Sequence, residues 1–193
     1  MKILFVTLEE SARQNLKSIL ADKFFTQNSK DIYTFGFQDN NFNFKDVTNI
    51  EIKSIMGITN IISNILYLLK LRIRLNEIIS KNNFTHTFFI DSFDFTKFYL
   101  NKFKSNNIKY CQIIGPSVFI WKVSKAKYIN NNLDHIFSIF EIESKYYLPK
   151  IYTYIGHPIY NNVFPNNNNI NKISNIGIFL GSRFQEILTN INT

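Results

Sequence analysis

The 193-residue sequence has one cysteine, three histidines and six glycines. A single cysteine excludes a disulfide-stabilised secreted domain. Cys111 and the histidines (His86, His135 and His157) lack the spacing of metal ligands, and we expect His86 and His135 to make structural hydrogen bonds in strands. With so few glycines the chain contains no GxGxxG motif and no glycine-rich phosphate loop.

Long hydrophobic runs are also absent. No stretch reaches the roughly 18 consecutive apolar residues of a membrane-spanning helix. At the N-terminus only Ile3–Val6 precedes Glu9 and Glu10, which does not resemble a signal peptide. With 45% hydrophobic residues, the length predicts a cytosolic globular domain, alone or with the start of a second.

The net charge of +8 raises nucleic acid or an anionic membrane as a partner. The chain has 27 Asn, 31 Ile and 20 Phe, and only 4 of its 22 basic residues are Arg. These residue types have AT-rich codons, so we favour lysine accumulation on solvated faces as the explanation of the charge. No RNA-binding motif is present. The four arginines are therefore of particular interest: Arg13, Arg72, Arg74 and Arg183.

Short apolar runs alternate with amphipathic segments along residues 1–155. This alternation predicts an α/β fold with a Rossmann-like, doubly wound parallel sheet. The expected strands are Lys2–Thr7, Ile32–Phe37, Ile50–Ile52, Thr85–Ile90, Ile108–Ile114, His135–Phe140 and Ile151–Ile155. The expected helices are Glu10–Leu20, Ile58–Leu69 continued by Leu71–Ser80, Phe95–Lys104, Lys125–Asn131 and Glu141–Tyr147.

The composition changes after residue 160. Residues 161–175 are rich in asparagine and lack apolar periodicity, which is typical of a linker. Ile176–Leu180 is another buried-strand run, followed by Gly181, Ser182 and Arg183. We therefore expect a first domain over 1–160, a linker over 161–175 and the start of a truncated second domain over 176–193.

Candidate functional groups follow the strands, because open α/β sheets hold ligands at the carboxyl ends of their strands. Asp91 and Asp94 lie between a strand and a helix, and either one is a candidate helix cap or a general base. Gly115–Lys122 follows the next strand and contains Ser117 and the only tryptophan, Trp121. His157 follows the last strand of the first domain.

Five segments in order resemble lipid-A-disaccharide synthase. They are Ser54–Ile58, Ile90–Phe95, Gly115–Lys122, Ile155–Pro158 and Leu180–Ile187. The resemblance implies the N-terminal domain of a GT-B glycosyltransferase and the first motif of its C-terminal domain. It implies transfer of 2,3-diacylglucosamine from its UDP derivative to 2,3-diacylglucosamine 1-phosphate, giving a β-1,6 disaccharide with inversion and without a metal or other cofactor.

The resemblance also implies roles for individual residues. Asp91 matches the essential aspartate, which would act as the base. Ser182 and Arg183 match the UDP-diphosphate site, where no metal shares the charge. The other implied substrate-binding residues are Glu9, Ser11, Ser117, Trp121 and His157.

Two segments depart from the family pattern. Gly-Glu-x-Ser-Gly-Asp is replaced by Leu8–Arg13, which keeps Glu9 and Ser11 but reverses the charge of its last residue. Trp-Ala-Trp-Arg is replaced by Phe119–Lys122. The family enzyme is about twice as long. An inactive remnant, a half that works with a separately encoded second half or as a homo-oligomer, and a basic Rossmann-like nucleic-acid-binding module therefore stay open as alternatives.

The acylated substrates imply contact with the inner face of a Gram-negative inner membrane, with the protein cytoplasmic and peripheral. Residues Ile55–Ile79 combine an apolar face with Lys70, Arg72 and Arg74. This pattern fits a helix lying on a membrane surface, and it fits a core helix with a basic edge equally well.

Overall fold

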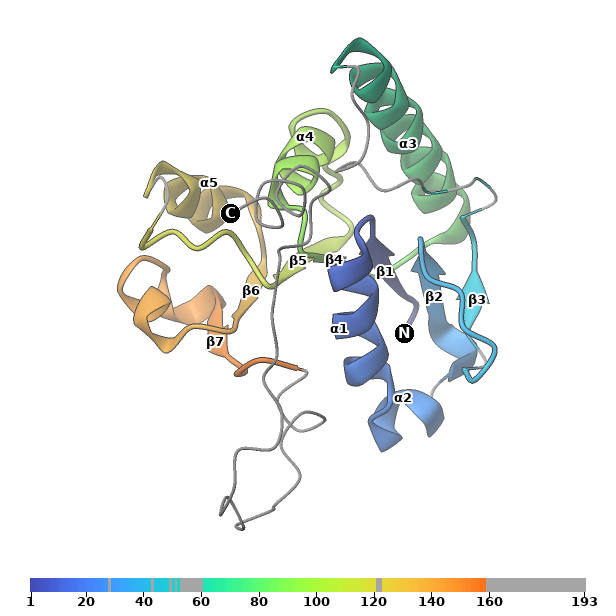
Figure 1. Cartoon of the computed structure of the whole chain (residues 1–193), viewed down its shortest axis with the longest axis horizontal. Helices are drawn as coiled ribbons and strands as arrows, with labels where there is room; N and C mark the ends of the chain where they lie inside the picture. The colour runs from blue at the N-terminus through green and yellow to red at the C-terminus, as the bar shows by residue number, and fades with distance from the viewer. Residues whose placement is uncertain are drawn as a thin grey trace, which may run out of the picture.

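The computed structural model describes residues 1–158 except 28, 43, 49, 51, 53–60 and 121–122. Strands and helices alternate along this part of the chain (Figure 1). The strands are β1 (Ile3–Thr7), β2 (Ile32–Phe35), β3 (Lys45–Asp46), β4 (His86–Ile90), β5 (Lys109–Ile113), β6 (His135–Ser138) and β7 (Tyr152–Tyr154). The α-helices are α1 (Glu10–Leu20), α2 (Lys23–Gln27), α3 (Ile61–Asn82), α4 (Phe93–Phe103) and α5 (Ser124–Asn132), with short 3₁₀ turns at Ser29–Asp31, Glu141–Lys145 and Pro149–Ile151.

The described strands form one sheet of order β3-β2-β1-β4-β5-β6-β7, in which every pair is parallel. The chain first runs outward from β1 to β3 and then resumes at β4 on the other side of β1. The topological switch point therefore lies at the carboxyl ends of the neighbouring strands β1 and β4, where doubly wound sheets bind ligands. The predicted Rossmann-like, doubly wound α/β fold, of the kind expected for a GT-B domain, is confirmed.

Helices cover the two faces of the sheet. On one face, α3, α4 and α5 pack Leu71, Tyr99 and Ile129 into the larger apolar core (Figure 1). On the other face, α1 contributes Leu16 and Leu20 to a second core. A strand buried on both faces favours apolar residues at successive positions, which explains the apolar run Ile3–Val6 in β1.

Most predicted elements are confirmed to within two residues, and the helix Glu10–Leu20 has the expected bounds. The predicted strand Ile50–Ile52 is wrong. The edge strand is instead Lys45–Asp46, which is exposed and polar and so carries no apolar pattern. The 3₁₀ turn at Glu141–Lys145 replaces a predicted helix, and the short helix α2 was not predicted.

Helix α3 is a single helix where the sequence suggested two stretches, and the predicted start at Ile58 lies outside the described residues. Arg72 is not part of an exposed basic edge. Its guanidinium lies 3.7 Å from the centre of the Phe98 ring and donates a hydrogen bond to the Phe98 carbonyl oxygen at 3.0 Å. Arg72 is therefore a packing residue between α3 and α4. Within the described residues no helix has the length and apolar character needed to span a bilayer.

Substitution of Gly36 tests how closely the backbones at the ends of β1 and β2 pack together. Its φ is +91°, and a Cβ at this position would lie 1.9 Å from the Thr7 carbonyl oxygen. We expect Gly36→Ala to lower the free energy of unfolding by more than about 2 kcal/mol, because backbone strain and a backbone clash add together. Urea unfolding measures the change.

Gly156→Ala is the matched control. Gly156 also has a positive φ, +68°, but an added Cβ would have its nearest neighbour 4.0 Å away. Strain alone should cost about 1 kcal/mol. Equal losses for the two variants would show that the close approach at Gly36 contributes nothing.

Candidate active site

The carboxyl ends of parallel strands meet at one edge of the sheet, so this edge collects the predicted site residues. Glu9 and Ser11 follow β1, Asp91 follows β4, Ser117 follows β5 and His157 follows β7. Because β1 and β4 are neighbours in the sheet, the first three residues belong to the switch point.

Asp91 occupies an unusual backbone conformation. Its φ is +58° and that of Ser92 is +40°, so two consecutive residues other than glycine are left-handed. The Asp91 N–H donates to the Ile113 carbonyl oxygen at 3.0 Å, and the Gln112 side-chain amide donates to the Asp91 carbonyl oxygen at 2.7 Å. Such strain persists where surrounding contacts enforce it, and it is common at functional sites.

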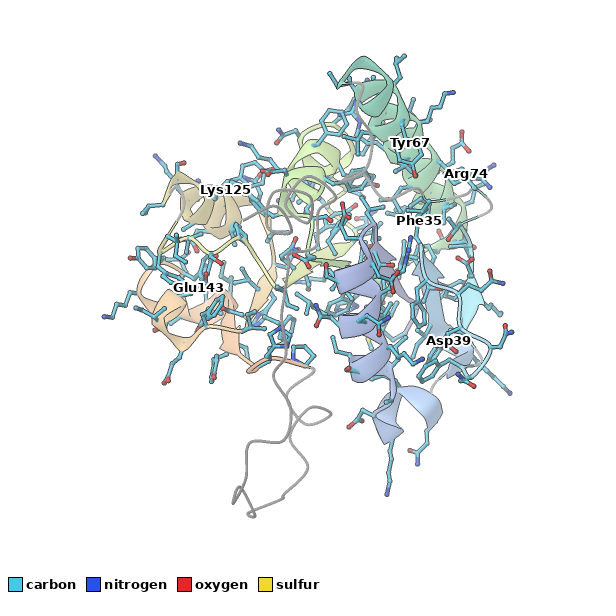
Figure 2. The ribbon with its side chains drawn as sticks, in the orientation of Figure 1. Phe35, Asp39, Tyr67, Arg74, Lys125 and Glu143 are labelled. Atoms are coloured by element: carbon cyan, nitrogen blue, oxygen red, sulfur yellow. The ribbon has the colours of Figure 1, made fainter. Side chains whose placement is uncertain are left out.

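The tight turn lets α4 begin at Phe93, two residues earlier than the sequence predicted. The N-cap is Ser92, so the reading of Asp91 or Asp94 as the cap is wrong. Asp94 lies in the first turn, where its charge favours the helix. Its exposed carboxylate pairs with the Lys125 ammonium of α5 at 2.9 Å (Lys125 is labelled in Figure 2).

The Asp91 carboxylate is held from the first turn of α1. The Ser11 hydroxyl donates a hydrogen bond to Asp91 Oδ2 at 3.0 Å, which joins two residues that lie 80 positions apart. Glu9 is nearby. Burial raises its pKa, as does the neighbouring negative charge of Asp91, while Arg13 acts in the opposite direction. The structure thus brings together Glu9, Ser11 and Asp91.

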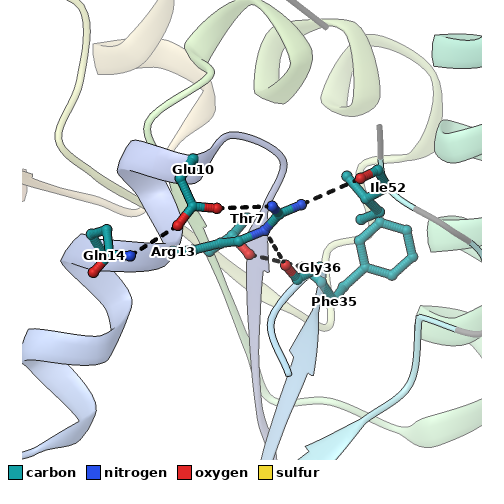
Figure 3. A network of polar contacts seen from close by, with 7 residues as sticks. All are labelled: Thr7, Glu10, Arg13, Gln14, Phe35, Gly36 and Ile52. Carbon is teal, nitrogen blue, oxygen red and sulfur yellow. Dashed lines mark hydrogen bonds and ion pairs between the residues drawn. The ribbon is translucent and has the colours of Figure 1, made fainter. Parts of the chain in front are cut away.

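Arg13 ties the first turn of α1 to the residue that follows β2 (Figure 3). Its Nε donates to the Gly36 carbonyl oxygen at 2.8 Å, and a terminal nitrogen donates to the Ile52 carbonyl oxygen at 3.5 Å. The other terminal nitrogen pairs with Glu10 at 3.1 Å, and hydrogen bonds from Gln14 and Arg13 lower the Glu10 pKa. The arginine at position 13 therefore has a structural role: it connects α1 with the main chain at Gly36 and Ile52.

The other two departures in this loop point away from the sheet edge. Leu8 is 1% exposed and lies in the larger core, while Ala12 is fully buried in the core beneath α1. Their Cβ atoms therefore contribute to packing.

The loop after β5 carries Ser117, which is half-buried and accepts a backbone hydrogen bond from Ile120 at 3.1 Å. Glu143, which no sequence motif indicates, holds this loop from the other side. Its carboxylate accepts hydrogen bonds from the Val118 N–H at 3.2 Å and the Ser138 hydroxyl at 2.5 Å. Burial raises the pKa of Glu143, and these two hydrogen bonds oppose that rise.

Of the four remaining predicted residues, the structure describes one. His157 is exposed beyond β7, the edge strand three positions from β4. Trp121, Ser182 and Arg183 lie outside the described residues. His86 and His135 lie in strands and pair with Thr85 and Thr153, which confirms their structural interpretation. Among residues that the structure describes, no group of three acidic, histidine or cysteine side chains could hold a metal ion.

A family model described as Lipid-A-disaccharide synthetase matches residues 3–193. The chain belongs to the lipid-A-disaccharide synthetase family. It is 27% identical over 123 residues to proteins named lipid-A-disaccharide synthase from Francisella tularensis subsp. tularensis (strain WY96-3418) and subsp. novicida (strain U112). Each match covers 62% of this chain and 32% of the relative. The chain spans about half the length of the curated relatives that it matches.

The electrostatic coupling of Glu9 and Asp91 can be tested directly. Because the Asp91 charge raises the Glu9 pKa, Asp91→Asn should lower it, while Asp94→Asn, whose carboxylate faces Lys125, should leave it unchanged. A carbon-13 NMR titration of the Glu9 carboxyl measures both. An unchanged Glu9 pKa in Asp91→Asn would show that the two groups titrate independently.

Proposed function

We propose that the chain supplies the acceptor side of a lipid-A-disaccharide synthase. The reaction is transfer of 2,3-diacylglucosamine from its UDP derivative to the 6-hydroxyl of 2,3-diacylglucosamine 1-phosphate. The observation that carries this proposal is the position of Asp91: a half-buried carboxylate at the switch point, oriented by Ser11, in a chain that the family model matches from residue 3 to 193.

In this mechanism Asp91 is the general base. Its carboxylate takes the proton of the acceptor hydroxyl as that oxygen attacks the anomeric carbon of the donor sugar. The bond from that carbon to the phosphate oxygen breaks, and UDP leaves with the electron pair. Ser11 limits rotation of the carboxylate. The family resemblance suggests that Glu9 would contact the sugar hydroxyls.

The remaining parts of the site are assigned from the family resemblance. Residues 1–160 would be the acceptor-side domain, 161–175 a linker and 176–193 the start of the nucleotide-sugar domain. Ser182 and Arg183 would neutralise the UDP diphosphate, while Ser117, Trp121 and His157 would contact the substrates. The rest of the nucleotide site would come from a second half of the enzyme or from a second copy.

Substitution at Asp91 tests the role of the base. The chain is assayed alone and together with the C-terminal domain of a Francisella relative, using the UDP-sugar donor and the acylated acceptor. Asp91→Asn should lower turnover by at least about 100-fold, because general-base catalysis contributes this much or more. Asp94→Asn should retain turnover within about threefold. Equal losses for the two variants would contradict the assignment.

Helix α3 is the candidate contact with the cytoplasmic face of the inner membrane. Ile65, Leu66 and Ile73 of this helix are about half exposed, and Lys70 beside them is exposed too. Apolar side chains beside a cation are the features of a helix that lies on an anionic lipid surface. The buried Arg72 takes no part in this surface.

Vesicle flotation tests the α3 surface. The pair Leu66→Ser and Ile73→Ser should reduce binding to anionic vesicles several-fold, because it removes apolar area without touching the core. The control pair Ile142→Ser and Leu148→Ser replaces side chains that are similarly exposed elsewhere. If both pairs weaken flotation equally, α3 is not the contact surface.

A further inference from the structure

Next to the Glu9, Ser11 and Asp91 group, α3 and α4 enclose a cavity of about 430 Å³. Its walls are mostly apolar and aromatic: Ile65, Leu68, Phe93, Phe95 and Phe98. The polar residues of its lining are Glu9, Ser92 and Asp94. This volume lies in the range of cavities that hold small organic ligands. We call it the α3–α4 groove.

One end of the groove adjoins the proposed base. Glu9 and Ser92, which is bonded covalently to Asp91, both line the cavity. The Ser92 hydroxyl is buried and finds no hydrogen-bond partner among the described residues. This end therefore offers polar groups to a ligand whose remaining length lies against hydrocarbon.

The groove also reaches the exposed apolar surface of α3. Ile65 is both a wall residue and a surface residue, with 52% of its area exposed. The groove thus connects the surface proposed to contact the membrane with the surroundings of Asp91. A ligand that extends between them has a hydrocarbon part toward α3 and a polar head toward the carboxylates.

The far wall is rigid. Arg72, one helical turn beyond Leu68, stacks its guanidinium on the Phe98 ring and bonds to the Phe98 backbone. Phe93 and Phe95 are 5% and 6% exposed and belong to the larger core. Because these side chains are held by packing, the groove is largely pre-formed, which reduces the entropic cost of binding.

We propose that the α3–α4 groove binds one acyl chain of the acylated sugar substrate, with the sugar head group placed at Asp91. This inference rests on the proposed function, which supplies an acylated acceptor. It adds a binding site for one acyl chain of the substrate. It also assigns the preference for acyl-chain length to Ile65 and Leu68. A bulkier side chain at either position would shorten the groove without altering Asp91.

A methyl NMR titration of the full 193-residue chain with octyl β-glucoside, kept below its micelle-forming concentration and without vesicles, tests the groove. This uncharged probe has a sugar head and one alkyl chain, and methyl β-glucoside is the control without a chain. We expect saturable shifts of the Ile65 and Leu68 methyl groups with the octyl compound only. Ile155, which lines a second apolar hollow, should not respond.

Substitutions then establish the site. Ile65→Trp and Leu68→Trp should each weaken octyl β-glucoside binding at least fivefold. Because Ile65 is 52% exposed, we expect Ile65→Trp to fold normally. Ile155→Trp and the pair Leu66→Ser and Ile73→Ser should leave it within twofold. Unchanged affinity in Ile65→Trp, loss in Ile155→Trp, or methyl shifts that follow protein concentration rather than probe concentration would overturn the groove assignment.

The experiments distinguish a failure of the groove assignment from a failure of the proposed function. Groove binding without any sugar transfer in the complemented assay would contradict the proposed function alone. Transfer whose dependence on acyl-chain length is the same in Ile65→Trp and in the unsubstituted chain would contradict the groove alone.

Discussion

The Gln112 side chain holds the candidate site together. It is fully buried in β5, and its amide nitrogen donates to the carbonyl oxygens of Asp91 at 2.7 Å and Ile114 at 3.2 Å. Its oxygen accepts from the Thr96 hydroxyl of α4 at 2.9 Å. One amide therefore connects two strand ends with the helix between them. Without it, the left-handed residues Asp91 and Ile114 would each carry an uncompensated cost of about 1–2 kcal/mol.

Gln112 and Arg13 act on opposite sides of the switch point. Gln112 fixes the backbone that carries Asp91, while Arg13 ties the start of α1, and with it Ser11, to the end of β2. The 3.0 Å contact between Ser11 and Asp91 lies between these two supports. Its geometry depends on both supports, because each one alone fixes only one of the two side chains.

The sequence predicts the layout of the described sheet well, because buried parallel strands favour continuous apolar runs such as Ile3–Val6. It fails at Lys45–Asp46, since an exposed edge strand has no reason to be apolar. For the site, strand order explains why Glu9, Ser11 and Asp91 meet. Glu143 was missed because its partners, the Val118 backbone and Ser138, are set by tertiary folding. Gln112 left one weak signal: an amide between the apolar residues Cys111 and Ile113 of a predicted strand.

The chemistry of the Arg13 contacts has an evolutionary consequence. Among the described residues outside its own helix, the hydrogen-bond partners of Arg13 are two main-chain carbonyl oxygens, those of Gly36 and Ile52. Every residue type presents the same carbonyl oxygen, so mutation at position 52 leaves this contact available as long as the backbone keeps its path. In a chain rich in Asn, Ile and Lys, the residue at position 52 can therefore change without loss of this hydrogen bond. Position 13 still requires arginine, because its guanidinium supplies several donors in a fixed geometry.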